Sequence, residues 1–304
     1  MQHHHPWRAT VSATDLALFA TVVILWGASW LPLRLQLGVV APEVSGVWRF
    51  AIASAVMFVW AGLAGERLRF GLADHLRFMV LGVTLFSLNF LGAYYAGFYL
   101  TSGLLAVIFS LASVINPLLA ALLGRGAFDL RVLLGAGLGV AGISLLFGPE
   151  IATTHASQQT ALGLALALVA TVSFCIGNMF SSAYQQGGMP VVPANSWGMF
   201  YGMVLMALVA LMRGEPFIVE WTARYLLSIA WLALAGTVIG FFAYVTLIGR
   251  IGPGRASYAT VLMPVVALVL STLFEQYHWT LAAALGVAFV LAGNAIVLTA
   301  PQRT

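Results

Sequence analysis

Charged residues are scarce in this sequence of 304 residues. They make up only 7% of the chain, whereas a soluble domain has about 25%, and 62% of the residues are hydrophobic. Such a chain lacks the polar side chains that a water-facing surface needs. The strands of a transmembrane barrel would alternate in hydrophobicity over about ten residues, and the long apolar runs here do not. The sequence therefore predicts an all-α polytopic membrane protein.

Cysteine and lysine are also scarce. The one cysteine, Cys175, lies in an apolar run, so no disulfide can form within the chain and no thiolate cluster can hold a metal. All 13 basic residues are arginines, and their scatter over short loops argues against nucleic-acid binding. We therefore expect no metal, no cofactor and no nucleic-acid partner.

Carboxylates and histidines are missing from the middle of the apolar runs. A carrier driven by protons or sodium commonly uses a buried carboxylate, so the sequence favours facilitated transport or coupling through another group. An intramembrane serine protease would need a histidine near a membrane serine, and the six histidines lie in the N-terminal tail, in loops or at the ends of runs. We therefore do not expect an enzyme. The carboxylates at run ends or in loops include Asp15, Glu43, Glu150, Glu215, Glu220 and Glu275.

Ten apolar runs approach the length of about 20 residues that a membrane-spanning helix needs. With the N-terminus in the cytoplasm, nine arginines would lie inside and three outside, which agrees with the preference for positive charge in the cytoplasm. An even number of spans would place the C-terminus there too. The ten predicted helices cover residues 15–35, 44–64, 76–97, 102–123, 131–148, 160–183, 194–212, 224–248, 253–274 and 279–299.

The second half of the chain repeats the first. A shift of 151 residues places Gly103 on Gly254 and Gly135 on Gly286. The repeat unit has five spans, an odd number, so the second copy would enter the membrane inverted; inverted repeats are typical of transporters that work by alternating access. The predicted organisation is a cytoplasmic tail at 1–14, a five-helix repeat at 15–150, a periplasmic linker at 151–159, an inverted five-helix repeat at 160–300 and a C-terminal tail at 301–304.

Polar side chains recur at helical spacing in six of the runs, namely the first, third and fourth of each half. Such residues are costly in hydrocarbon and tend to face a cavity, so we predict one central cavity that binds substrate. For each serine or threonine the alternative is a hydrogen bond to its own backbone or to a neighbouring helix. The candidate substrate-binding residues are Trp26, Trp30, Asn89, Tyr99, Ser110, Ser113, Asn116, Asn178, Ser182, Tyr244, Ser257 and Thr260.

Two prolines interrupt the fourth and ninth runs. Pro117 and Pro264 each remove a backbone hydrogen bond and can kink a helix. We interpret them as bending points that open opposite sides of the cavity. A fixed kink that shapes the bundle is the alternative.

Arg49 is the exception to the rule that charges avoid the runs, because it lies a few residues inside the second run. It could extend to the membrane interface, or it could pair with Glu43 or with a phosphate. Glycines gather on one face of the fifth and tenth runs, where we interpret them as outer support or as a dimer contact. They are Gly135, Gly139, Gly142, Gly286 and Gly293.

Several stretches together match a known pattern: WGASWLPLRL in the first run, Pro42 with Arg49-Phe50 near the start of the second, and residues 103–125 and 135–142. They resemble the EamA family of the drug/metabolite transporter superfamily, and within it most closely the YddG-type aromatic amino acid exporters. The second half resembles the same domain again. The resemblance implies ten helices in two inverted repeats, cytoplasmic termini, and a cavity built by the six polar runs. It also implies export of amino acids and similar metabolites across the bacterial inner membrane.

The chain departs from the family pattern in its first half. Ser113 stands where many members have proline, and Arg125 stands where they have an acidic residue. The first-half proline is displaced to Pro117, whereas Pro264 and Glu275 keep the pattern. We therefore expect the two halves to move unequally.

The expected function is export of aromatic and other neutral amino acids by alternating access through the central cavity. Aromatic walls would stack on an aromatic side chain, and amide and hydroxyl groups would bind the zwitterion. The alternatives are a carrier of other small metabolites or drugs, a channel, and a lipid-handling protein. The expected partners are the small-molecule substrate and the lipid bilayer, and the chain is expected to be a monomer or a homodimer.

Overall fold

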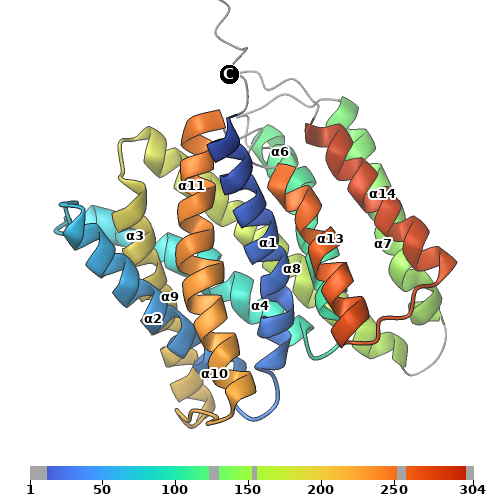
Figure 1. Ribbon diagram of the computed structural model, residues 1–304, viewed down its shortest axis with the longest axis horizontal. Helices are drawn as coiled ribbons and strands as arrows, with labels where there is room; N and C mark the ends of the chain where they lie inside the picture. The colour runs from blue at the N-terminus through green and yellow to red at the C-terminus, as the bar shows by residue number, and fades with distance from the viewer. Residues whose placement is uncertain (1–11, 123–129, 153–155, 252–257, 299–304) are drawn as a thin grey trace, which may run out of the picture.

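The computed structural model describes residues 12–122, 130–152, 156–251 and 258–298. Every regular element within these ranges is a helix, and the helices lie side by side in one bundle (Figure 1). A helix satisfies its own backbone hydrogen bonds, which is why helical bundles suit hydrocarbon surroundings. The all-helical fold class is thus confirmed for the described part of the chain.

The helices follow the predicted ranges closely. The first half forms α1 (Ala13–Leu35), α2 (Pro42–Leu63), α3 (Leu72–Val83), the π-helical segment η1 (Thr84–Leu88), α4 (Asn89–Ala96), α5 (Ser102–Ser110), α6 (Ala112–Leu122) and α7 (Leu130–Ala152). The second half forms α8 (Ala156–Gln186), α9 (Val191–Arg213), α10 (Ala223–Ala230), the π-helical segment η2 (Trp231–Ile239), α11 (Gly240–Ile251), α13 (Tyr258–Phe274) and α14 (Leu281–Leu298).

Seven helices or continuous helical runs in the described residues are long and apolar enough to cross a membrane. Shorter apolar helices occupy Leu130–Leu146, Ala259–Phe274 and Leu281–Val297, where the sequence predicts the fifth, ninth and tenth spans. The chain is therefore a polytopic helical protein. The count of ten spans depends on these three shorter helices and stays a prediction.

Local sequence explains several helix starts. The Ser12 hydroxyl accepts a hydrogen bond from the backbone N–H of Asp15, and the Asp15 carboxylate accepts one from the backbone N–H of Ser12, which forms a capping box. Thr101 and Thr222 cap α5 and α10 through their hydroxyl oxygens. Pro42 begins α2 at a position where its missing N–H has no intrahelical partner to lose.

The helices pack in pairs that correspond between the two halves. Helix α1 packs on α11 and α13, and α8 packs on α4 and α6. The contacts of α1 with the second half therefore have counterparts in the contacts of α8 with the first half. Three further contacts join equivalent helices of the two halves, namely α2 with α9, α5 with α13 and α7 with α14.

Helices α7 and α14 form the right-hand edge of the bundle in Figure 1 and pack through glycines. A Cβ atom on Gly142 would lie 2.6 Å from the carbonyl oxygen of Gly286, and one on Gly293 would lie 2.7 Å from that of Gly135. No real side chain fits at those distances, so the glycines allow the two backbones to touch. The glycine faces therefore meet within this chain, which agrees with the interpretation as outer support.

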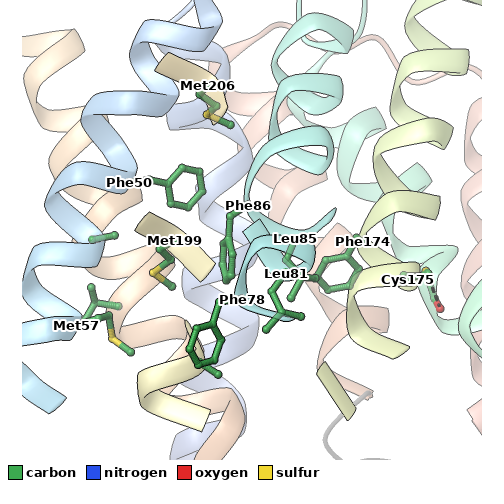
Figure 2. Packing of buried hydrophobic residues seen from close by; sticks show 14 of the residues in the cluster. Phe50, Met57, Phe78, Leu81, Leu85, Phe86, Phe174, Cys175, Met199 and Met206 are labelled. Atoms are coloured by element: carbon green, nitrogen blue, oxygen red, sulfur yellow. Dashed lines mark hydrogen bonds between the residues drawn. The ribbon is translucent and has the colours of Figure 1, made fainter. Parts of the chain in front are cut away.

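The largest apolar cluster joins α2, α3, η1 and α9. Figure 2 shows Phe50, Phe78, Phe86, Met199 and Met206 pointing toward one another, and each is buried. The Phe50 and Phe86 rings meet edge to face, with centroids 5.7 Å apart. The same cluster continues to residues that line a cavity in the middle of the bundle, so the core holds the cavity wall in place.

Candidate functional site

A cavity lies between the two halves of the chain. Water-sized molecules can occupy about 70 Å³ of it. One water needs about 10–15 Å³ on this measure, so the cavity holds a few waters and has to widen before it can hold an amino acid. Its lining comes from α1, α2, α4 and α5 of the first half and from α8, η2, α11 and α13 of the second. The lining residues are Trp26, Ser29, Trp30, Leu33, Arg49, Asn89, Phe90, Ala93, Phe109, Phe174, Leu232, Gly236, Phe241 and Met263.

Six of the 14 residues that line the cavity are aromatic. The Trp26 ring packs against Phe241 and Tyr244, with centroids 5.4 Å and 4.9 Å apart. On the other side, Trp30 meets Phe109 edge to face at 5.2 Å. Rings held at these separations attract one another beyond their apolar burial, so they form a stiff apolar surface. That surface suits a flat apolar group of a ligand.

Two glycines bring α1 close to the second half. A Cβ atom on Gly236 would lie 2.5 Å from Ser29 Oγ, and one on Gly240 would lie 2.5 Å from Trp26 Nε1. The Trp26 indole N–H donates a hydrogen bond of 3.1 Å to the Gly236 carbonyl oxygen. The absence of side chains at these glycines therefore sets the position of the Trp26 ring at the cavity.

The two π-helical segments occupy similar places in the two halves. Segment η1 lies within the third predicted span and η2 within the eighth. Such segments within α-helices frequently occur at functional sites. Asn89 directly follows η1 and lines the cavity, and η2 contributes Leu232 and Gly236 to the lining. Nothing in the local sequence had indicated either segment.

Arg49 is held in the middle of the bundle rather than at its edge. It is the eighth residue of α2, about 10 Å along the helix from its start. Its side chain is buried and lines the cavity. Both Nε and Nη2 donate to Thr237 Oγ1, at 3.3 Å and 3.0 Å, and the guanidinium carbon lies 4.1 Å from the centre of the Phe90 ring. Both predicted interpretations of Arg49 within the protein, extension to the membrane interface and pairing with Glu43, are wrong.

Arg49 has no carboxylate partner among the described residues. Its Nη1 nitrogen is buried without a hydrogen-bond partner, although the Tyr94 hydroxyl lies near the guanidinium. Glu43 instead accepts a hydrogen bond of 2.6 Å from the Tyr95 hydroxyl and lies 3.4 Å from Arg213. A buried guanidinium without an opposite charge is costly, so it marks a candidate binding site for an anion.

Three of the predicted binding residues line the cavity: Trp26, Trp30 and Asn89. A fourth, Tyr244, lies behind Trp26 and packs against its ring. Arg49, Ser29 and Phe241 also line the cavity although they were absent from the predicted set. The burial and unpaired state of Arg49 depend on distant residues, so its presence inside a run was the one available signal.

Ser110 and Ser113 point to a neighbouring helix instead. Ser113 Oγ donates to Asn294 Oδ1, and Asn294 Nδ2 donates to Ser110 Oγ, both at 2.8 Å. Asn294 belongs to α14 and is fully buried. This network fastens α5 and α6 to α14, which is the packing alternative that the sequence had left open for these serines.

The remaining predicted residues are dispersed. Tyr99 is exposed in the turn between α4 and α5, and Thr260 is buried in α13. Asn116 and Asn178 are half-buried, and the Oδ1 atom of Asn116 is buried without a hydrogen-bond partner. Ser182 is exposed and accepts a hydrogen bond from Gln186, while Ser257 lies outside the described residues.

The helix that contains Pro117 is interrupted before the proline. Helix α5 ends at Ser110 and α6 begins at Ala112, so the break falls at Leu111. The backbone N–H of Val114 there bonds to the Leu111 carbonyl three residues earlier, at 2.9 Å, which is a tighter turn than an α-helix makes. Helix α13 runs without interruption through Pro264. The candidate bending point of the first half therefore lies at Leu111, between one and two turns before Pro117.

Ion pairs join the two halves at both ends of α1. The upper ion pair, named for its position in Figure 1, links Asp15 of α1 to Arg250 of α11. The lower ion pair links Arg34 of α1 to Glu275, which follows α13, with 2.6 Å between Nη1 and Oε1. One ion pair between the halves thus lies at each end of α1.

Comparison with known proteins agrees with this architecture. The EamA-like transporter family matches residues 14–148 and 161–299. The chain belongs to the EamA-like transporter family. Other proteins of known sequence that resemble it include an uncharacterized transporter, YoaV, of Bacillus subtilis (22% identity; 90% of this chain and 92% of YoaV) and a probable amino-acid metabolite efflux pump of Escherichia coli K12 (23% identity; 93% and 94%).

A solved crystal structure also resembles this EamA-like chain. The TM-score is 0.67 at 18% identity, and the similarity covers 94% of this chain and 97% of the other. At that identity the likeness concerns the fold alone. The family and the relatives named here are transporters rather than enzymes, so this EamA-like protein is a multi-pass membrane transporter of small metabolites.

Proposed function

We propose that this EamA-like protein exports aromatic and other neutral amino acids across a bacterial inner membrane by alternating access. One observation carries the proposal. The cavity between the halves combines aromatic walls with a single buried guanidinium that has no carboxylate partner among the described residues. An aromatic amino acid has a flat apolar group that would pack against the rings and a carboxylate that would bind Arg49.

The relatives support a transported metabolite of this kind. The Escherichia coli relative is named a probable amino-acid metabolite efflux pump. Its identity to this chain is low, so both the substrate and the direction of transport are part of our proposal. Relatives from bacteria likewise support the proposed inner-membrane location.

The packing supports an alternating mechanism with inverted repeats. The helix contacts of the first half correspond to those of the second, as expected for two related five-helix units. In the described conformation the cavity is small and an ion pair joins the halves at each end of α1, so we propose that these two ion pairs act as gates. Substrate would enter when one ion pair separates and leave when the other does, with the break at Leu111 as a flexible point.

Counterflow in proteoliposomes tests the proposal directly. Vesicles loaded with unlabelled phenylalanine should accumulate labelled phenylalanine, and tryptophan and leucine should compete. Absence of exchange for every natural amino acid would contradict the proposal. A steady electrical conductance in planar bilayers would instead support a channel.

A further inference from the structure

The cavity offers a charged partner for a carboxylate but none for an amino group. Among the described residues that line it, Arg49 is the single charged one. An amino acid zwitterion carries both a carboxylate and an ammonium group, and these two groups would meet very different surroundings here. That asymmetry bears on which molecules the cavity accepts.

The guanidinium of Arg49 is held by hydrogen bonds through two of its nitrogens, while the third makes none. Thr237 Oγ1 donates to the Leu232 carbonyl oxygen at 2.7 Å and accepts from Arg49 Nε and Nη2. That bond to Leu232 spans five residues within η2, so the π-helical segment orients the hydroxyl oxygen toward α2. The Phe90 ring lies against the guanidinium, and Nη1 has no hydrogen-bond partner. The arginine is thus fixed in place while one of its donor nitrogens stays available.

An ammonium group would find only neutral acceptors in the cavity. Asn89 donates through Nδ2 to the Leu85 carbonyl, which leaves its Oδ1 atom as an acceptor, and Ser29 donates to the Leu25 carbonyl. Hydrogen bonds between ionised partners are about twice as strong as those between neutral ones. The positive charge of Arg49 would in addition repel a ligand cation in this apolar space.

We propose that the cavity selects aromatic monocarboxylates through Arg49 and does not require the amino group. This deepens the proposed function and rests on it in one respect, namely that the central cavity binds an aromatic ligand. Aromatic acids that lack the amino group, such as 3-phenylpropionate, bind as well as phenylalanine does. Aromatic amines that lack the carboxylate, such as 2-phenylethylamine, do not.

The first experiment compares three competitors that share one ring and differ in charge. Labelled phenylalanine counterflow is measured in proteoliposomes at neutral pH with added phenylalanine, 3-phenylpropionate or 2-phenylethylamine. We expect the acid to inhibit at concentrations within about threefold of phenylalanine. The amine should need about 10- to 100-fold more, which is the factor expected for a lost hydrogen bond to a charged group. An amine that competes as well as the acid would overturn the inference.

The second experiment assigns the selectivity to Arg49. The Arg49→Gln variant removes the charge, and an unpaired buried charge is costly, so the variant is expected to fold. In this variant the acid should lose about 10- to 100-fold in apparent affinity while the amine changes less than threefold. Arg77→Gln serves as a matched control, because Arg77 is exposed and pairs with Asp74 within α3. Retention of tight acid binding by Arg49→Gln would contradict the assignment.

A binding measurement keeps the inference separate from the proposed function. The shift of the melting temperature of the detergent-purified protein is recorded with each of the three ligands. A wild-type protein that 3-phenylpropionate stabilises but that transports no amino acid would contradict the proposed function and retain the inference. A protein that exchanges phenylalanine but binds the amine as tightly as the acid would contradict the inference and retain the proposed function.

Discussion

The two ends of α1 are both tied to the second half of the chain, yet the ties differ in construction. At the upper end, Arg250 contacts Asp15 and donates at 3.2 Å to Ser12, so it engages the cap of a single helix. At the lower end, Arg34 also donates to the Gly97 carbonyl, and Glu275 accepts from both the backbone N–H and the hydroxyl of Ser102. The residues of the lower ion pair therefore connect three segments of the chain, and those of the upper ion pair connect two.

The two ends also differ in exposure. The side chain of Arg250 is 44% exposed and that of Arg34 is 34% exposed, whereas both carboxylates are largely buried. Water weakens an ion pair most where both partners reach it. The lower end should thus be the harder one to open, and the comparison predicts unequal effects when each end is broken.

The charge in the middle of the bundle contrasts with both ends. Asp15, Glu275 and their arginines neutralise one another, whereas Arg49 has no carboxylate partner in the described residues. Pairing at the ends stabilises a closed bundle without any ligand. The unpaired charge of Arg49 is neutralised only when a ligand of opposite charge binds in the cavity.

Of the two ends of α1, the lower one should show the larger effect when its ion pair is broken. Glu275→Gln removes the charge that Arg34 and Ser102 contact, which should favour opening of this end by about 1–2 kcal/mol, or about 5- to 30-fold. The readout is labelling of Ala93→Cys, a cavity-lining position, in a Cys175→Ser background. A membrane-impermeant thiol reagent added to the lower face should react faster by that factor. Unchanged labelling would show that this ion pair does not close the cavity.

Breaking the upper ion pair should have a smaller effect. Asp15→Asn removes the carboxylate that Arg250 contacts, and because Arg250 is substantially exposed the expected change is about 0.5–1 kcal/mol, or two- to fivefold. The same Ala93→Cys labelling is measured with reagent added to the upper face. Asp74→Asn is the matched control, since it breaks a pair within α3 that does not join the halves. An effect larger than that of Glu275→Gln would reverse the ranking of the two ends.

The sequence could predict the helices but not the contacts between residues that are far apart in the chain. Hydrophobic runs and glycine or proline breaks are local properties, which is why each predicted range coincides with a helix or a run of helices. Asn294 is 184 and 181 residues away from Ser110 and Ser113 in the sequence, and Arg49 meets Thr237 only after α2 and η2 have packed together. Partners so distant in sequence cannot be read from spacing, so the serines seemed to belong to the cavity and Arg49 did not.

Two of the predictions relied on chemistry that is local to a residue. The large rings of Trp26 and Trp30, next to Gly27 and Ser29, indicated a cavity because an indole beside small residues can reach a neighbouring helix or an open space. The glycines of α7 and α14 indicated close packing because they lack a side chain. The π-helical segments, by contrast, arise from tertiary packing and have no local sequence pattern.

The smallest expected effect is a dependence of the lower end on pH, because only a fraction of Glu275 is protonated just below its usual pKa. Burial by itself raises the pKa of Glu275, but hydrogen bonds from Arg34 and Ser102 outweigh burial and hold the pKa below its usual value of 4.5. A carboxylate with a lowered pKa contributes its stabilisation above the usual pKa and loses it as the pH falls through the lowered one. The lower end should therefore stay closed from pH 7 to pH 5 and open progressively below about 4.5.

The pH dependence is measured as the ratio of two labelling rates. Dividing the Ala93→Cys rate in the otherwise unchanged protein by the rate in Glu275→Gln at each pH removes the pH dependence of the thiol chemistry itself. The ratio should be low and constant above pH 5 and should rise toward one in more acidic solution, because protonation of Glu275 produces the same neutral group as the substitution. A ratio that rises already between pH 7 and pH 5 would mean that a different group controls this end, and the contrast between the two ends of α1 would then need another cause.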